Sequence, residues 1–122
     1  MIGCEWLSKY GIDLKLLEQA KHGQVIPTTL SEVYVKLNDV DRGEMLHLIG
    51  SWLFSNSAEK RYDARFIISK NNIIELLPTL KSIKSNIMHS ADISFKYEID
   101  LIADLILKLE KASIKIISES KT

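Results

Sequence analysis

The stretch that decides the fold runs from Arg61 to Ile83 and reads RYDARFIISKNNIIELLPTLKSI. Apolar residues recur along it at helical spacing, but two consecutive asparagines, Asn71 and Asn72, interrupt the pattern. Asparagine tolerates the left-handed backbone conformation in which many helices end. We therefore expect two helices joined by a tight turn and packed antiparallel, with their apolar faces together. A single longer helix with a kink is the alternative.

The proline at position 78 fits the start of the second helix. Proline is costly in a helix interior because it lacks an amide hydrogen and its ring clashes with the preceding turn. In the first turn no hydrogen bond is lost. The apolar spacing that restarts at Ile73 therefore predicts a helix that begins near Glu75, with Pro78 in its first turn.

The same spacing predicts an all-α chain of about six helices. The predicted ranges are 12–20, 30–37, 41–54, 58–69, 75–87 and 95–109. Thr29 and Glu32 match a capping box, in which a hydroxyl and a carboxylate bond each other's free amides, and they place the start of the second helix near Leu30. Because β-branched and aromatic residues at 33–35 are poor helix formers, a strand is the alternative for 30–37.

The helix 41–54 has clear start signals and a clear apolar face. Asn38 and Asp39 supply an N-cap and negative charge for its first turn. The apolar face consists of Met45, Leu46, Ile49, Trp52 and Leu53. In the next helix, 58–69, the residues assigned to the core are Tyr62, Ala64, Ile67 and Ile68.

The last predicted helix has one long apolar stripe. Ser94 is its expected cap, and the stripe consists of Phe95, Ile99, Ile102, Ile106 and Leu109, widened by Leu101 and Leu105. The tail from Ser113 to Thr122 is expected to extend this helix or to fray at its end.

Length and composition predict one helical domain, residues 1–122, with a single core. Lysine plus arginine equals aspartate plus glutamate at 16 each, so no overall charge favours nucleic acid or an anionic membrane. The single cysteine, Cys4, excludes an intramolecular disulfide. With no secretory signal and no apolar run of membrane-spanning length, we expect a cytoplasmic protein that contacts no membrane.

From about residue 41 to 110 the helix order resembles that of HEAT-type repeats. The motif Arg61-Tyr62-Asp63-Ala64 is similar to the family's first helix, and Leu77-Pro78-Thr79-Leu80 to its second. The asparagine pair stands where the family usually has glycine. The resemblance implies antiparallel helix pairs stacked as a short α-solenoid, whose second helices line a concave surface. On that register the face consists of Asp41, Glu44, His47, Ser51, Glu75, Thr79 and Ser82.

Two pairs of residues have metal-ligand spacing. Glu44 and His47 lie three apart on a helix, but di-iron bundles need two such pairs and further carboxylates. Asp100 and Asp104 lie one turn apart, with Lys96 and Lys108 each four residues away, so a ladder of surface ion pairs is favoured over a cation site. The sequence predicts no cofactor, no metal and no enzymatic activity.

Small helical proteins of this kind resemble bacterial immunity proteins, including those that accompany contact-dependent growth inhibition toxins. The resemblance implies that the chain binds and neutralises a cognate protein toxin. Residues 32–46 hold four acids against two bases, which would suit a basic toxin such as a nuclease. The alternatives are a nucleic-acid-binding adaptor that uses the C-terminal lysines, and a metal-dependent hydrolase that uses Glu44 and His47.

Overall fold

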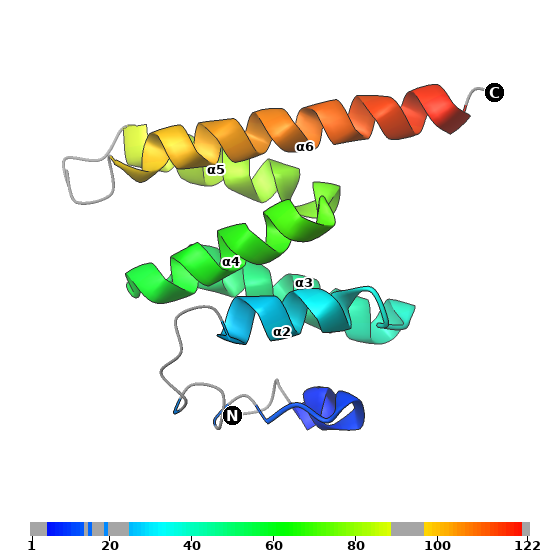
Figure 1. The fold of residues 1–122 in the computed structure, drawn as a ribbon. Coiled ribbons are helices and arrows are strands. Elements are labelled where there is room, and N and C mark those ends of the chain that lie inside the picture. Colours follow the sequence, from blue (N-terminus) through cyan, green and yellow to red (C-terminus); the bar gives the residue numbers. More distant parts are fainter. Residues whose placement is uncertain (1–4, 14, 16–18, 20–24, 89–96, 121–122) are drawn as a thin grey trace. The chain divides into compact units, whose positions relative to one another are not determined.

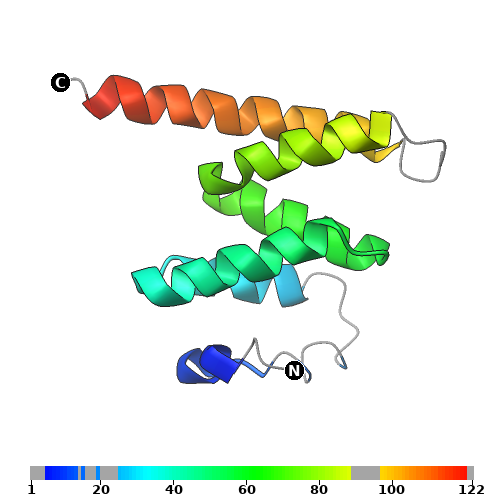
Figure 2. The ribbon, with the colours of Figure 1, turned by 180° about the vertical axis from the view of Figure 1, so that it is seen from behind.

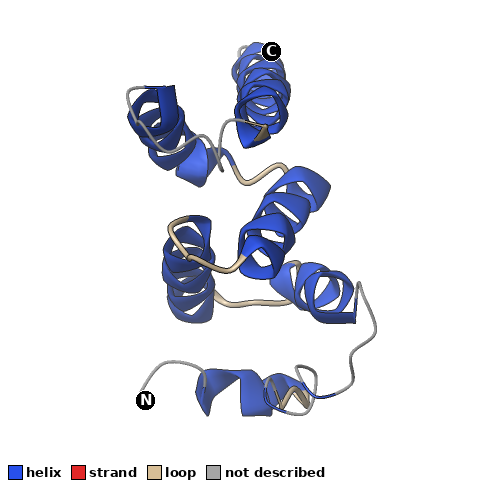
Figure 3. Cartoon of the chain, turned by 90° about the vertical axis from the view of Figure 1, so that its left-hand side faces the viewer, coloured by secondary structure: helices blue, strands red, loops and turns tan. Residues whose placement is uncertain are grey.

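The computed structural model describes residues 5–13, 15, 19, 25–88 and 97–120. Figure 3 shows helices and loops in these ranges and no strand, which confirms the predicted all-α class for the described residues. The elements are η1 (Glu5–Tyr10), α2 (Val25–Tyr34), α3 (Asp39–Leu53), α4 (Ala58–Asn71), η2 (Ile74–Leu76), α5 (Leu77–Met88) and α6 (Glu98–Ser120), where η marks a 3-10 helix (Figure 1). None of these described helices is long and apolar enough to cross a bilayer.

The described part of the chain therefore contains five α-helices and two 3-10 helices. Most of the predicted helix 12–20, together with the predicted cap Ser94 and the start of the last helix at Phe95, lies outside the described residues. The 3-10 helix η1 was not predicted. The chain divides into two compact units, residues 1–67 and 68–122, and the boundary falls inside α4.

The second helix begins earlier than the capping box predicted. It starts at Val25 and ends at Tyr34, so Thr29 lies inside the helix and the predicted start at Leu30 is wrong. Pro27 explains the difference: a proline in the first turn loses no hydrogen bond and has the backbone angle of a helix. The strand alternative for 30–37 is also wrong, because residues 30–34 belong to this helix and a turn follows directly at 35–36.

The N-cap of α3 was predicted correctly, and the helix begins at Asp39, two residues before the predicted Asp41. Asn38 has an extended backbone, and its side-chain Oδ1 accepts a hydrogen bond from the Asp41 amide at 2.8 Å. This bond satisfies one of the free amides of the first turn. Met45, Ile49 and Trp52 are buried as expected, and they belong to the core of the first unit. That core consists of Leu7, Ile12, Leu30, Val33, Leu37, Met45, Ile49, Trp52, Leu53, Ala64 and Ile67.

The predicted break between two helices is confirmed at the asparagine pair. Helix α4 ends at Asn71, and Asn72 has a φ of 48°, in the left-handed region. The Ile73 amide then donates a hydrogen bond to the Ile68 carbonyl at 3.1 Å, and both isoleucines are buried. This hydrogen bond and the positive φ of Asn72 are those of a Schellman motif, with asparagine in the place of glycine. The antiparallel packing of α4 and α5 stays a prediction.

Pro78 lies in the first turn of α5, as predicted. The short helix η2 precedes it, so the chain becomes helical at Ile74 and α-helical at Leu77. In the second unit α5 and α6 lie side by side and run in opposite directions (Figures 1 and 2). Their buried residues include Leu80, Ile83, Ile102, Leu105, Ile106 and Leu109.

Two residues assigned to the core are exposed, and helix geometry explains both errors. Tyr62 lies about 200° around α4 from Ala64, so it faces away from the buried side and packs on Phe66 instead, with ring centroids 6.3 Å apart. Leu101 lies about 80° around α6 from Leu109, at the edge of the apolar stripe. Helix α6 also continues to Ser120, so the C-terminal tail extends it.

Candidate protein-binding face

One side of α3 is exposed along its whole length. Val40, Glu44, His47, Ser51 and Phe54 recur in steps of four, three, four and three, which places them in a single row. The two apolar residues at the ends of the row are well exposed, with 76% of Val40 and 62% of Phe54 accessible to solvent. We call these five residues the α3 face.

The α3 face contains three of the residues that the sequence assigned to partner binding. Glu44 and His47 present a carboxylate and an imidazole at the surface. The Ser51 hydroxyl donates to the Leu48 carbonyl at 2.7 Å, so its oxygen is available to a partner as an acceptor. The centre of the face therefore offers polar groups, and its ends offer apolar ones.

Asp41, the fourth predicted residue on this helix, is buried. Its Oδ2 accepts a hydrogen bond from the Tyr10 hydroxyl at 2.8 Å, and the Lys9 ammonium lies 3.6 Å from its Oδ1. The carboxylate also lies in the first turn of α3, where the helix dipole favours negative charge. The chain itself thus satisfies the group that the sequence assigned to a partner, and Asp41 holds η1 against α3.

The hydrogen bond between Tyr10 and Asp41 also affects the phenol. The hydrogen bond to Asp41, partial burial and the negative charge of Asp41 all raise the pKa of Tyr10 above its ordinary value of 10.0. Tyr10 therefore remains a hydrogen-bond donor to Asp41 throughout the physiological pH range.

A glycine lies beside the α3 face. Gly43 precedes Glu44, and a Cβ built on it would meet nothing within 4 Å. Glycine in a helix interior is less stable than alanine by about 1 kcal/mol, because its backbone loses more freedom on folding. No neighbour within the chain requires the side chain at position 43 to be absent. The glycine therefore leaves room for a group from outside the chain to approach closely.

The other predicted residues lie in the second unit. Glu75, at the surface of η2, and Ser82, on α5, are exposed, and Thr79 is partly exposed. Their spacing of four and three places them on one side of their own segment. Glu44, His47 and Ser51 belong to residues 1–67, and this second set belongs to residues 68–122.

The candidate metal ligands are spread over the surface. In the described parts of the chain, no three histidine, cysteine, aspartate or glutamate side chains gather into a group that could hold an ion. Asp100 and Asp104 are both exposed.

The ion-pair ladder predicted around these two aspartates included Lys96 and Lys108. Lys96 lies outside the described residues, and Lys108 bonds to Ser69 of α4. Its ammonium donates to the Ser69 carbonyl and, at 2.9 Å, to the Ser69 hydroxyl, which caps the C-terminal turn of α4.

Asp63 is the carboxyl group with the most unusual environment. It is buried in α4, and Glu59 carries a second negative charge one turn earlier. Burial, and to a smaller extent the charge of Glu59, raise the pKa of Asp63 from 3.8 to about 6. Asp63 is not a member of the α3 face, and its protonation affects the stability of the fold.

Sequence reasoning missed three members or neighbours of the face: Val40, Gly43 and Phe54. The signal was present, because Val40 and Phe54 continue the row of Glu44 and Ser51 on the side opposite Met45 and Trp52. The link between Asp41 and Tyr10 could not be read from the sequence, because 31 positions separate the two residues.

Comparison of the chain with protein-family models, with curated proteins and with solved structures gave no match.

Proposed function

We propose that this chain is a non-enzymatic protein-binding module of the cytoplasm, and that the α3 face is where its partner docks. The observation that carries the proposal is the exposed row from Val40 to Phe54, with apolar ends and a polar centre. Protein interfaces are typically built around a few aromatic and aliphatic anchors, with polar groups that fix the register. In this proposal Phe54 and Val40 are the anchors, and Glu44 and His47 supply the specific hydrogen bonds.

Helix rigidity also supports a binding role. Val40 lies on the 15-residue helix α3 and Phe54 is its C-cap, so the backbone of both anchors loses little conformational freedom when a partner docks. Gly43 lets a partner's backbone approach α3 closely, as small residues do where helices pack tightly. In the HEAT-like arrangement that the sequence resembles, α3 and α5 would both be second helices of stacked pairs. Glu75, Thr79 and Ser82 are the binding residues proposed for the second unit.

The most concrete partner is a toxin domain that the chain neutralises. The exposed acids around α3 are Glu32, Asp39 and Glu44, against Lys36 and the partly buried Arg42. Asp41 is neutralised internally, so the local acidic excess is smaller than the sequence suggested. Recognition would therefore depend more on contact through the anchors than on long-range attraction of a basic toxin.

The test is a binding measurement between the full chain and the toxin domain encoded next to it in its genome. Calorimetry with the wild type should give a saturable one-site isotherm. Phe54→Ala should weaken binding by roughly 10- to 100-fold, the usual effect of losing an aromatic anchor. Glu44→Lys should weaken it as well, and Glu32→Lys, which reverses the charge of an exposed acid on α2, serves as the matched control.

A second variant separates binding from folding. Gly43→Gln should stabilise the chain by about 0.5–1 kcal/mol, because glutamine is a better helix former. The same side chain fills the space beside the α3 face, so binding should weaken while stability rises. Glu75→Lys tests the predicted second half of the surface. If Phe54→Ala, Glu44→Lys and Gly43→Gln all bind like the wild type, the α3 face is not the docking site.

A further inference from the structure

Helix α6 carries an exposed apolar row that its own unit leaves uncovered. Leu107 and Ile114 are 53% and 66% exposed, and Ala103 is partly exposed. At 100° per residue these three side chains fall within about 40° of each other around α6. The row lies apart from the buried stripe of Ile102, Leu105 and Leu109, so the core of the unit does not cover it.

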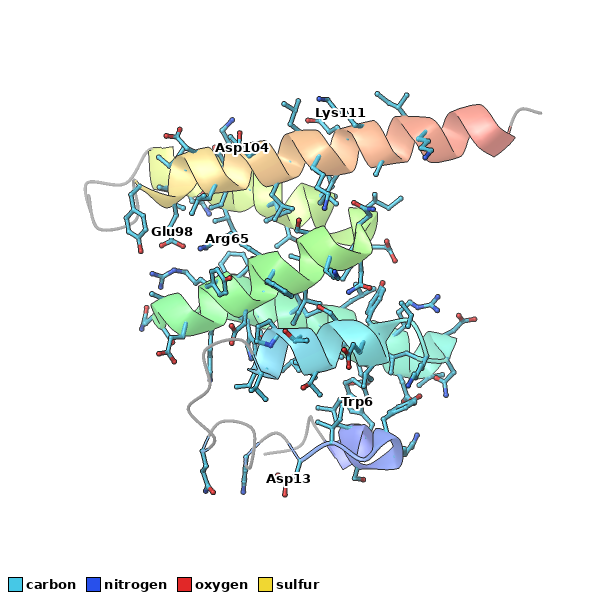
Figure 4. The ribbon with its side chains drawn as sticks, viewed as in Figure 1. Trp6, Asp13, Arg65, Glu98, Asp104 and Lys111 are labelled. Carbon is cyan, nitrogen blue, oxygen red and sulfur yellow. The ribbon has the colours of Figure 1, made fainter. Side chains whose placement is uncertain are left out.

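The exposed charges beside this row have a regular order. Asp100 and Asp104 precede Leu107, and Lys111 and Lys115 follow it, and all four are exposed. Each lies between about 20° and 80° around the helix from Leu107, in the same direction. They therefore form one flank, acidic toward the N-terminus and basic toward the C-terminus. Figure 4 shows Asp104 and Lys111 on the same side of α6.

The opposite flank is already in use within the unit. Glu110 lies about 60° from Leu107 in the other direction and forms an ion pair with Lys81 of α5 at 3.7 Å. The four charges beside the row are thus on the side away from α5. A partner helix lying on the row would meet them directly.

The positions of these charges are symmetric about a single point on the helix. Asp104 and Lys111 each lie 3.5 residues, or about 5 Å, from the midpoint between 107 and 108. Asp100 and Lys115 each lie 7.5 residues, or about 11 Å, from the same point. A two-fold axis at that midpoint makes two copies of α6 antiparallel. Residues at equal distances on either side of the midpoint then face each other across the two copies.

We infer that the row of Ala103, Leu107 and Ile114 is a homodimer interface in which α6 packs antiparallel against α6 of a second copy. The axis pairs Asp104 with Lys111 of the partner and Asp100 with Lys115 of the partner, so four ion pairs form on one flank. Leu107 lies next to its symmetry mate, and the small Ala103 faces the region of the partner's Ile114. The ion pairs and the apolar contacts are therefore both self-complementary. A face that binds an unrelated protein would not require this symmetry.

Sedimentation equilibrium of the full chain tests this inference. One helix per copy is a small interface, so the wild type should dimerise with a Kd of roughly 10–100 µM. Leu107→Glu should raise the Kd by about 100-fold, because it places two carboxylates at the axis. Leu101→Glu is the matched control: Leu101 is 49% exposed on the same helix but lies about 120° from Leu107. It should leave the Kd unchanged.

Charge reversal tests the antiparallel register. Asp104→Lys should raise the Kd by about tenfold, because each of its two copies then faces Lys111 of the partner. Adding Lys111→Asp to the same chain should restore the wild-type Kd, and circular dichroism of every variant should show unchanged helix content. A wild type that stays monomeric to about 1 mM overturns the inference. A dimer that Leu107→Glu and Leu101→Glu weaken equally, or that the double reversal fails to restore, overturns it too.

Discussion

At the scale of single residues, Asn72 ends α4 with one unusual backbone angle. A left-handed conformation costs an ordinary residue about 1–2 kcal/mol, and asparagine less, because its side chain can bond locally. The sequence predicted this break because two asparagines stand together between apolar segments. The hydrogen bond from Ile73 to Ile68 that completes the cap could be seen only in the structure.

Asn72→Ala should lower the free energy of unfolding by about 1–2 kcal/mol, since alanine is strained at a φ of 48°. Asn72→Gly should instead equal or exceed the stability of the wild type, because glycine adopts this angle freely. Urea unfolding measures both. Lys70→Ala is the control, since Lys70 is exposed in the last helical turn of α4 and should tolerate alanine. Equal effects of alanine at both positions would contradict the cap.

Asp63 gives the fold a defined pH dependence. Its pKa is about 6 in the folded chain and near 3.8 when unfolded, so between these values the folded state holds a proton that the unfolded state has released. Stability from this group therefore falls as the pH rises from about 4 to 6 and is constant above that. Asp63→Asn should stabilise the chain by roughly 1–3 kcal/mol at pH 7.

The measurement for Asp63 is urea unfolding of both proteins from pH 4 to 8. The advantage of Asp63→Asn over the wild type should be largest above pH 6 and should shrink toward pH 4. Glu59→Gln should give a smaller gain, because it removes only the nearby charge and leaves Asp63 buried. An advantage for Asp63→Asn that grows as the pH falls would reverse the assigned sign.

At the scale of elements, helices with strong local signals at their starts were predicted well, and the start of α2 was not. Asn38 caps α3 and Pro78 opens α5 as expected, because caps and prolines act within one turn. The start of α2 was missed because Thr29 and Glu32 match a capping box although Pro27 begins the helix earlier. The 3-10 helix η1 has no comparable local signal, and Tyr10 and Lys9 connect it to α3 through Asp41.

Tyr10→Phe tests that connection. Removing the hydroxyl leaves the buried Asp41 carboxylate without one of its donors, which should cost about 1–3 kcal/mol. Hydrogen exchange should also become faster in η1 while the core of α3 changes little. Tyr97→Phe, which alters an exposed tyrosine, is the control and should be neutral. Normal exchange in η1 of the Tyr10 variant would show that Asp41 does not hold it.

At the scale of the whole molecule, burial decides which polar residues are available to a partner. The sequence selected α3 correctly as a helix with one polar side, because its apolar face was clear. It could not show that Asp41 is buried, since that depends on η1, or that Val40 and Phe54 stay exposed at the ends of the row. The α3 face and the α6 row share no residue, so heteromeric binding and dimerisation can be tested with different variants.

Site-specific photo-crosslinking in the native cell tests the proposed docking face most directly. The chain should be produced with p-benzoylphenylalanine in place of His47, at the centre of the α3 face, and in place of Glu32, an exposed residue on α2. We predict that irradiation links the chain carrying the probe at 47 to one other protein, and that the probe at 32 gives no such product. No crosslink from position 47, or the same product from both positions, would contradict a docking role for the α3 face.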